Sequence, residues 1–168
     1  QAQINPDANG NAWFVENLIQ VTSANEEINA LDSLNTKTTA VINSNKLTTD
    51  INFNFKKDAT ATITLLDYNV TSLTYQTNTE EEQFAVFSEI YYKNGWNVYV
   101  DGDLTPHYRV NYVLRGMKVP AGKHEIVFKF EPKVIQKGSL VSLISYGLLF
   151  AITIGWFFYD KKKKKKQA

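Results

Sequence analysis

The sequence predicts a mainly β fold: an antiparallel, jelly-roll-like β-sandwich with one short helix, followed by a single C-terminal transmembrane α-helix. Three observations lead to this prediction. Apolar and polar residues alternate in short runs along most of the chain. Turn residues separate these runs at intervals of roughly eight to twelve residues. Finally, one stretch of 20 residues near the C-terminus is apolar and uncharged.

The N-terminal part begins with a loop at 5–11, whose Asn, Pro, Asp and Gly residues are typical of turns. Residues 12–21 then alternate as one strand, with four apolar side chains on one face: Trp13, Val15, Ile19 and Val21. Ser23 and Glu26 have the spacing of a capping box, which predicts a short helix over 26–34. On this helix we expect Ile28 and Leu31 to share one side.

The rest of the domain alternates with a period of two, which is typical of strands with one buried face. The expected strands cover residues 39–43, 51–55, 61–65, 72–77, 84–92, 96–100, 108–114 and 125–130. Asn-Gly at 94–95 and Asp-Gly at 101–102 predict tight turns, and Pro-Ala-Gly at 120–122 predicts another.

Residues 140–159 predict a membrane-spanning helix, because 20 uncharged and predominantly apolar residues make a helix about 30 Å long, the thickness of the hydrocarbon core. Six lysines follow at 161–166, and the tendency of basic residues to stay inside places that end in the cytoplasm. The alternative is a buried core helix with a solubilising tail, but this segment is apolar all round.

The expected organisation follows from this segment. Residues 1–138 form an extracytoplasmic sandwich, 139–160 the transmembrane helix and 161–168 a cytoplasmic lysine-rich tail. The protein is thus expected in the cell membrane, with membrane lipid as one partner. Residues 131–138 are a brief connection, so the sandwich is expected close to the outer leaflet.

Composition excludes several kinds of chemistry. There is no cysteine, so disulfides and thiolate chemistry are impossible. Residues 1–139 hold 12 basic and 16 acidic residues, a net charge of −4, which argues against a nucleic-acid partner. No phosphate loop, metal-ligand spacing or nucleophile motif occurs, so we expect no catalytic residue, no metal and no cofactor in this chain.

One stretch is dense in aromatic, Arg and Asn residues, the residue types that stack on sugar rings and hydrogen-bond to hydroxyl groups. It makes a candidate glycan-binding set of six residues: Tyr92, Trp96, His107, Arg109, Asn111 and Arg115. The alternative is that half of this stretch lines the sandwich core and half braces its surface.

Several motifs in order carry a resemblance to a known family. They include Tyr-Tyr at 91–92, Gly-Trp at 95–96, Asp-Gly at 101–102, Asn111 followed by Leu-Arg at 114–115, Pro-Ala-Gly-x-His at 120–124 and Phe-Glu-Pro at 130–132. Upstream, residues 10–14 and 24–27 also fit. The sequence resembles the C-terminal region of bacterial YfhO-type membrane proteins over nearly its whole length.

The resemblance implies a part in glycosyl transfer. Members of this family are similar to multi-pass glycosyltransferases of the GT-C type, which use a polyprenyl-linked sugar to modify cell-envelope glycans. Their catalytic acid is expected in an early outer loop, outside this chain. The resemblance implies that this chain assists acceptor binding or packs over the active site. The alternative is a single-pass, membrane-anchored binding or structural β-domain with no enzymatic role.

Overall fold

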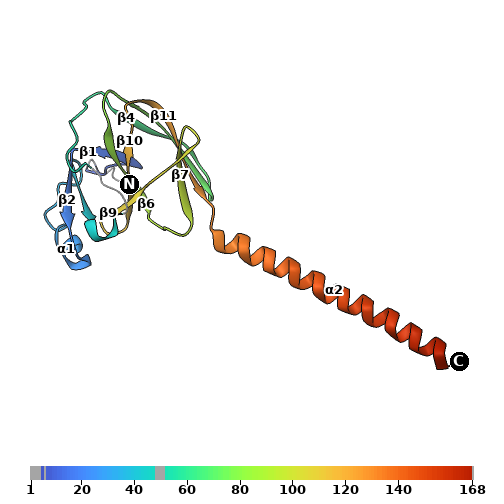
Figure 1. The fold of residues 1–168 in the computed structure, drawn as a ribbon. Coiled ribbons are helices and arrows are strands. Elements are labelled where there is room, and N and C mark those ends of the chain that lie inside the picture. The colour runs from blue at the N-terminus through green and yellow to red at the C-terminus, as the bar shows by residue number, and fades with distance from the viewer. Residues whose placement is uncertain (1–4, 6, 48–51, 168) are drawn as a thin grey trace. The chain divides into compact units, whose positions relative to one another are not determined.

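The computed structural model describes residue 5 and residues 7–47 and 52–167. The chain divides into two compact units, Gln1–Glu131 and Pro132–Ala168. The first is a β domain and the second is a helix (Figure 1). The predicted mainly β, two-sheet sandwich followed by a C-terminal helix is confirmed.

The β domain consists of two sheets. The six-stranded sheet has the order β1-β6-β10-β9-β3-β2, and the five-stranded sheet has the order β4-β5-β11-β7-β8. The strands of the first sheet are β1 Ala12–Val15, β6 Gln83–Ile90, β10 Leu114–Val119, β9 Tyr108–Val110, β3 Thr39–Asn43 and β2 Asn17–Val21. Those of the second are β4 Thr62–Tyr68, β5 Ser72–Thr79, β11 Gly122–Phe130, β7 Trp96–Val100 and β8 Asp103–Thr105.

The single strand expected at 12–21 is two strands that change partners at Glu16. β1 pairs with β6 at one edge of the six-stranded sheet, and β2 pairs with β3 at the other edge. Because one residue separates β1 from β2, the sheet curls until its two edges meet. The break also moves Ile19 off the apolar face: its side chain is 42% exposed, whereas Leu18 is buried.

Two clusters of apolar side chains fill the domain, one on each face of β6. Phe84 and Val86 pack inside the curled sheet with Val15, Ile42 and Val110. Ala85 and Phe87 point the other way, into the core between the two sheets, which β5, β7 and β11 complete. Because both faces of β6 are covered, residues 83–87 are all buried and do not alternate between apolar and polar side chains.

Several predicted elements differ from those observed. Residues 108–114 form β9 and β10 with a turn between them, because Asn111 and Tyr112 have φ of 47° and 70°. The turn at 93–95 exists, but β6 and β7 on either side of it belong to different sheets and make no hairpin. The predicted run at 51–55 makes only one isolated bridge, between Asn17 and Asn54, and Ile51 lies outside the described residues. All described pairs are antiparallel except β2 with β3.

The short helix α1 spans Ala24–Asn29 and ends before the predicted boundary at residue 34. Ser23 caps it as predicted, since its side chain accepts a hydrogen bond from the Glu26 N–H. The buried side chain of this helix is Glu27, whereas Ile28 is 47% exposed, and Leu31, expected on the same side of the helix as Ile28, lies beyond its end.

Helix α2 spans Lys133–Gln167, and its segment Lys133–Phe157 is long and apolar enough to cross a membrane. It is the one such helix in the described part of the chain, and none of it is buried within the protein. The helix includes most of the residues expected as a connection at 131–138. Two of its polar side chains, Ser145 and Thr153, bond back to Val141 and Phe150 carbonyls, which suits an apolar surrounding.

Candidate functional site

A cleft of about 660 Å³ opens on the β domain where β3, β8 and β9 meet the β6–β7 connection. Its walls combine aromatic rings, amides and two cations. The residues that line it are Ile42, Asn43, Leu47, Tyr91, Tyr92, Lys93, Asn94, Asn97, Leu104, Thr105, Pro106, His107, Tyr108 and Arg109. Among these described residues the charged side chains are Lys93 and Arg109, and no carboxylate is present.

The strand pattern of β9 brings His107 and Arg109 to this cleft. Tyr108 and Val110 are buried in the core, so the residues between and before them fall on the opposite side. Pro106 lacks an N–H and separates β8 from β9. The places of His107 and Arg109 in the cleft wall therefore follow from a two-residue alternation that the sequence displays, and Tyr108, though buried, also lines the cleft.

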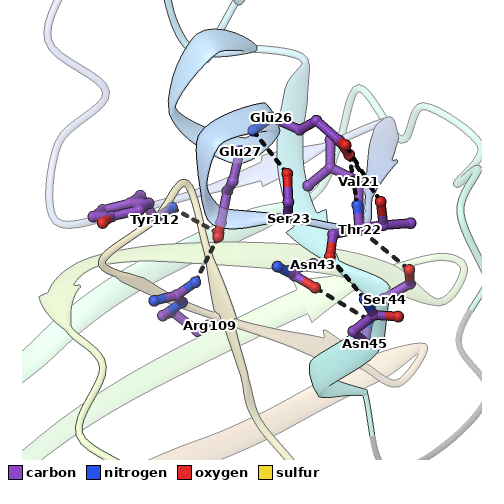
Figure 2. A network of polar contacts seen from close by, with 10 residues as sticks. All are labelled: Val21, Thr22, Ser23, Glu26, Glu27, Asn43, Ser44, Asn45, Arg109 and Tyr112. Atoms are coloured by element: carbon purple, nitrogen blue, oxygen red, sulfur yellow. Dashed lines mark hydrogen bonds and ion pairs between the residues drawn. The ribbon is translucent and has the colours of Figure 1, made fainter.

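Arg109 is held by the buried carboxylate of Glu27 (Figure 2). The Arg109 Nη2–Glu27 Oε2 distance is 2.5 Å, and the Tyr112 N–H donates to Glu27 Oε1 at 3.0 Å. The Glu27 side chain is completely buried and that of Arg109 is 23% exposed. The guanidinium also lies over the Tyr112 ring, 5.1 Å from its centre. Helix α1 thus fixes a cation that lines the cleft.

One local and two long-range hydrogen bonds hold the start of α1 in place (Figure 2). The Glu26 carboxylate accepts from the Thr22 N–H at 2.8 Å. The Asn45 side chain donates to the Thr22 carbonyl at 2.7 Å, and the Ser44 hydroxyl donates to the Val21 carbonyl at 3.1 Å. These bonds tie the start of the helix to the segment that follows β3.

Asn111 serves the sheet and is not among the residues lining the cleft. Its N–H donates to the Val41 carbonyl at 2.9 Å, and its side-chain oxygen accepts from the Val41 N–H at 2.8 Å. The residue therefore forms two bonds with β3 at a position with positive φ, a conformation that Asn adopts more readily than most residues. Its burial, at 7% exposure, agrees with this bracing contact.

Beyond the cleft, the buried side chain of Arg115 stacks on the half-buried ring of Trp96. The Arg115 guanidinium lies 4.3 Å from the centre of the Trp96 ring and 5.2 Å from that of Phe128. Its Nε donates to the Ile90 carbonyl at 2.9 Å, and the residue is 2% exposed. Burial lowers the pKa of Arg115, and the nearby Glu89 acts in the opposite direction. This geometry is that of a packed core contact.

His107 lies between two aromatic rings, with ring centres 5.1 Å from Tyr91 and 5.9 Å from Phe128. Burial, helped by the charge of Arg115, lowers the pKa of His107 to about 4, so the imidazole is neutral near pH 7. Its Nε2 is buried and has no hydrogen-bond partner in the described part of the chain. An unpaired buried polar atom costs about 1–3 kcal/mol.

Of the six candidate residues, the cleft brings together Tyr92, His107 and Arg109. The other three, Trp96, Asn111 and Arg115, pack or brace elsewhere. Sequence reasoning did not select other lining residues such as Asn43 and Leu104. Asn43 comes from β3, far from the aromatic stretch, and Leu104 lies within the stretch but is neither aromatic nor polar. The turn at Asp101–Gly102 was the available signal for Leu104, since it folds β8 back beside β7.

The second histidine, His124, makes a surface contact that depends on pH. Its Nδ1 lies 2.6 Å from Asp101 Oδ2, and its Nε2 lies 2.9 Å from the Ala121 carbonyl oxygen. Both ring nitrogens can donate only when the ring is protonated. The Asp101 carboxylate and the carbonyl accordingly raise the pKa of His124, and His124 lowers the pKa of Asp101.

We expect His124→Gln to reveal this contact as a change in the pH dependence of stability. A raised pKa means that the contribution is complete below the ordinary histidine value of about 6.5 and is lost as pH rises through the folded-state pKa. The thermal midpoint of the native chain should thus fall relative to that of the variant as the pH rises above about 6.5. Parallel profiles for the two proteins would contradict the contact. An NMR titration of the two histidines gives both pKa values directly.

The described residues contain no group of three or more acidic or histidine side chains that could hold a metal ion. A two-sheet β domain with a cleft, together with a helix long and apolar enough to cross a membrane, defines a membrane-associated β-domain protein. The chain belongs to the bacterial membrane protein YfhO family, whose model matches residues 16–142. The resemblance seen in the sequence is thereby confirmed. No curated protein and no solved structure gives a significant match.

Proposed function

We propose that this chain is the extracytoplasmic accessory domain and a membrane helix of a YfhO-type protein, and that its cleft binds a cell-envelope glycan during glycosyl transfer. The observation that carries the proposal is the cleft wall, in which Tyr91 and Tyr92 lie beside Asn94, Asn97 and Arg109. Aromatic rings provide stacking surfaces for sugar rings, and amide and guanidinium groups provide planar hydrogen-bond donors.

The state of His107 supports a ligand with hydroxyl groups. A neutral imidazole can accept a hydrogen bond, and Nε2 has no partner among the described residues. A small displacement of the ring would let a sugar hydroxyl satisfy it. The ligand class is an acceptor glycan or a polyprenyl-linked sugar, and the catalytic groups belong to other parts of a full-length protein.

The proposed topology places the β domain outside the cytoplasm and the lysine run at 161–166 inside. Basic residues next to a span remain preferentially on the cytoplasmic side and contact anionic headgroups. The family match and the apolar helix support membrane association. A maleimide-labelling assay on intact cells, with single cysteines placed at Asp103 and at Gln167, tests the orientation. Labelling of the second position alone would contradict it.

We expect Tyr92→Ala to weaken glycan binding about 3- to 10-fold, since one aromatic stacking contact contributes about 0.5–1.5 kcal/mol. Tyr92 is 48% exposed, so a stable fold should survive the change. The measurement is biolayer interferometry with the full chain in lipid nanodiscs, against purified teichoic acid and a purified neutral wall polysaccharide.

The matched control is Tyr68→Ala, which removes an aromatic side chain that is 63% exposed and does not line the cleft. It should bind as the native chain does. Equal binding by the Tyr92 variant, or no binding by the native chain to either polymer, would contradict the proposal and favour a membrane-anchored structural domain.

A further inference from the structure

Exposed apolar side chains gather at one end of the β domain. Among its described residues, nine large apolar side chains are exposed, and five of them define what we call the apolar rim: Tyr68, Val70, Ile90, Tyr92 and Val113. Val70 is 92% exposed and Ile90 is 69% exposed. Leu66, at 56%, lies two residues before Tyr68 on β4.

Backbone hydrogen bonds place these residues at the end of β11, where the chain leaves the domain. The Phe130 N–H donates to the Thr71 carbonyl at 2.8 Å, which fixes the β4–β5 turn there. The Glu131 N–H donates to the Gly95 carbonyl at 2.6 Å, which fixes the β6–β7 connection. Finally, the Tyr91 N–H donates to the Val113 carbonyl at 2.7 Å.

The opposite end of the sandwich is charged. The β5–β6 connection carries Glu80, Glu81 and Glu82, and Lys118 lies 3.7 Å from the Glu82 carboxylate. The His124–Asp101 pair lies at the same end, because the Asp101 N–H donates to the Glu125 carbonyl near the start of β11. One end of the domain thus exposes a group of apolar side chains, and the other exposes a group of carboxylates.

The connection between β11 and α2 is short, which limits the distance between the end of β11 and the apolar part of α2. Two residues, Glu131 and Pro132, separate β11 from α2, and two extended residues span at most about 7 Å. From Lys133 to Leu140, where the predominantly apolar run begins, the helix rises about 10 Å. A headgroup layer is about 5–8 Å thick on each side of the hydrocarbon. Together these two lengths are about 17 Å, so the covalent connection keeps the end of β11 within about 17 Å of Leu140.

We propose that the apolar rim contacts the surface of the lipid bilayer that α2 crosses, with Val70 and Ile90 inserted among the headgroups. The proposal rests on α2 spanning the membrane, as in the proposed function, but requires no glycan. Tyr side chains favour the membrane interface, where the ring is in an apolar layer and the hydroxyl in a wet one. Lys133 and Lys137 at the start of α2 provide cations for lipid phosphates.

The test uses single-cysteine variants. Because the sequence has no cysteine, each variant is labelled at the introduced position alone. Val70→Cys and Ile90→Cys are labelled with the environment-sensitive fluorophore NBD in the full chain, reconstituted in vesicles of phosphatidylcholine and phosphatidylglycerol. The expected result is emission at shorter wavelength and loss of intensity with shallow doxyl-labelled lipid. Lys123→Cys, near the charged end, is the control and should show the emission of a label in water.

Labels at 70 and 90 that behave like the label at 123 would overturn the proposal. Extraction of the native chain by alkaline carbonate would overturn it together with the membrane span. The glycan assay separates this inference from the proposed function. If the labels at 70 and 90 emit as in water while glycan binding is intact, the rim contact alone is contradicted. If the labels are quenched by lipid while the chain binds no glycan, the glycan proposal alone is contradicted.

Discussion

Replacing Arg115 by Ala is expected to lower the free energy of unfolding of the β domain by about 3–5 kcal/mol. The change empties a volume between Trp96 and Phe128 and removes the donor to the Ile90 carbonyl. Truncations of large buried side chains cost about 2–5 kcal/mol, and a desolvated cation–π contact adds about 2 kcal/mol. Chemical denaturation of the full chain in detergent, followed by tryptophan fluorescence, measures the loss.

Arg115→Met separates packing from charge. A methionine of similar length refills the space and brings no charge to desolvate, so the loss should be about half of that for Ala or less. The matched control is Lys129→Ala, which removes a cation 5.1 Å from the Tyr99 ring at the protein surface and should cost little. A stable Arg115→Ala variant that had lost glycan binding would instead return Arg115 to the binding site.

Glu27→Ala is expected to cost about 3–5 kcal/mol, because the change leaves Arg109 and the Tyr112 N–H without their buried acceptor. The loss of this anchor should also release Arg109 from its position in the cleft wall. Glycan affinity in the same nanodisc assay should therefore fall together with stability.

The control for this residue is its neighbour Glu26, which lies at the exposed start of α1. Glu26→Ala removes the bond to the Thr22 N–H and should cost much less than Glu27→Ala. The double variant Glu27→Ala with Arg109→Ala should recover part of the loss, since no unpaired buried charge remains. If the two single effects simply add, the ion pair does not couple helix α1 to the cleft.

Much of the fold could be predicted from the sequence because its strands obey local rules. β7 has the predicted bounds, Trp96–Val100, because turn residues mark both of its ends. β11 begins only slightly earlier than expected, at Gly122. Both strands alternate, with one face on the core, so that period-two patterning identifies them.

The errors arise where long-range contacts decide the outcome. The break at Glu16 has no local signal, because it depends on two partners, β6 and β3, that come later in the chain. Glu27 has the sequence pattern of a surface helix residue, and only its pairing with Arg109, 82 residues away, explains its burial. Asn111 and Arg115, two of the candidate residues, make bracing and packing contacts outside the cleft, and their predicted part in glycan binding stays a prediction.

The curled six-stranded sheet has a consequence for how the domain forms. A ribosome makes residues 12–21 before the other strands of this domain, yet β1 pairs with β6, whose paired residues 84–87 follow about 70 positions later. Closing so long a loop carries an entropic cost, and folding slows as contacts become less local. The segment that joins the two edges is therefore synthesised early and completed late. Until β6 emerges from the ribosome, the backbone N–H and C=O groups of β1 that will pair with β6 must be hydrated or held by a chaperone.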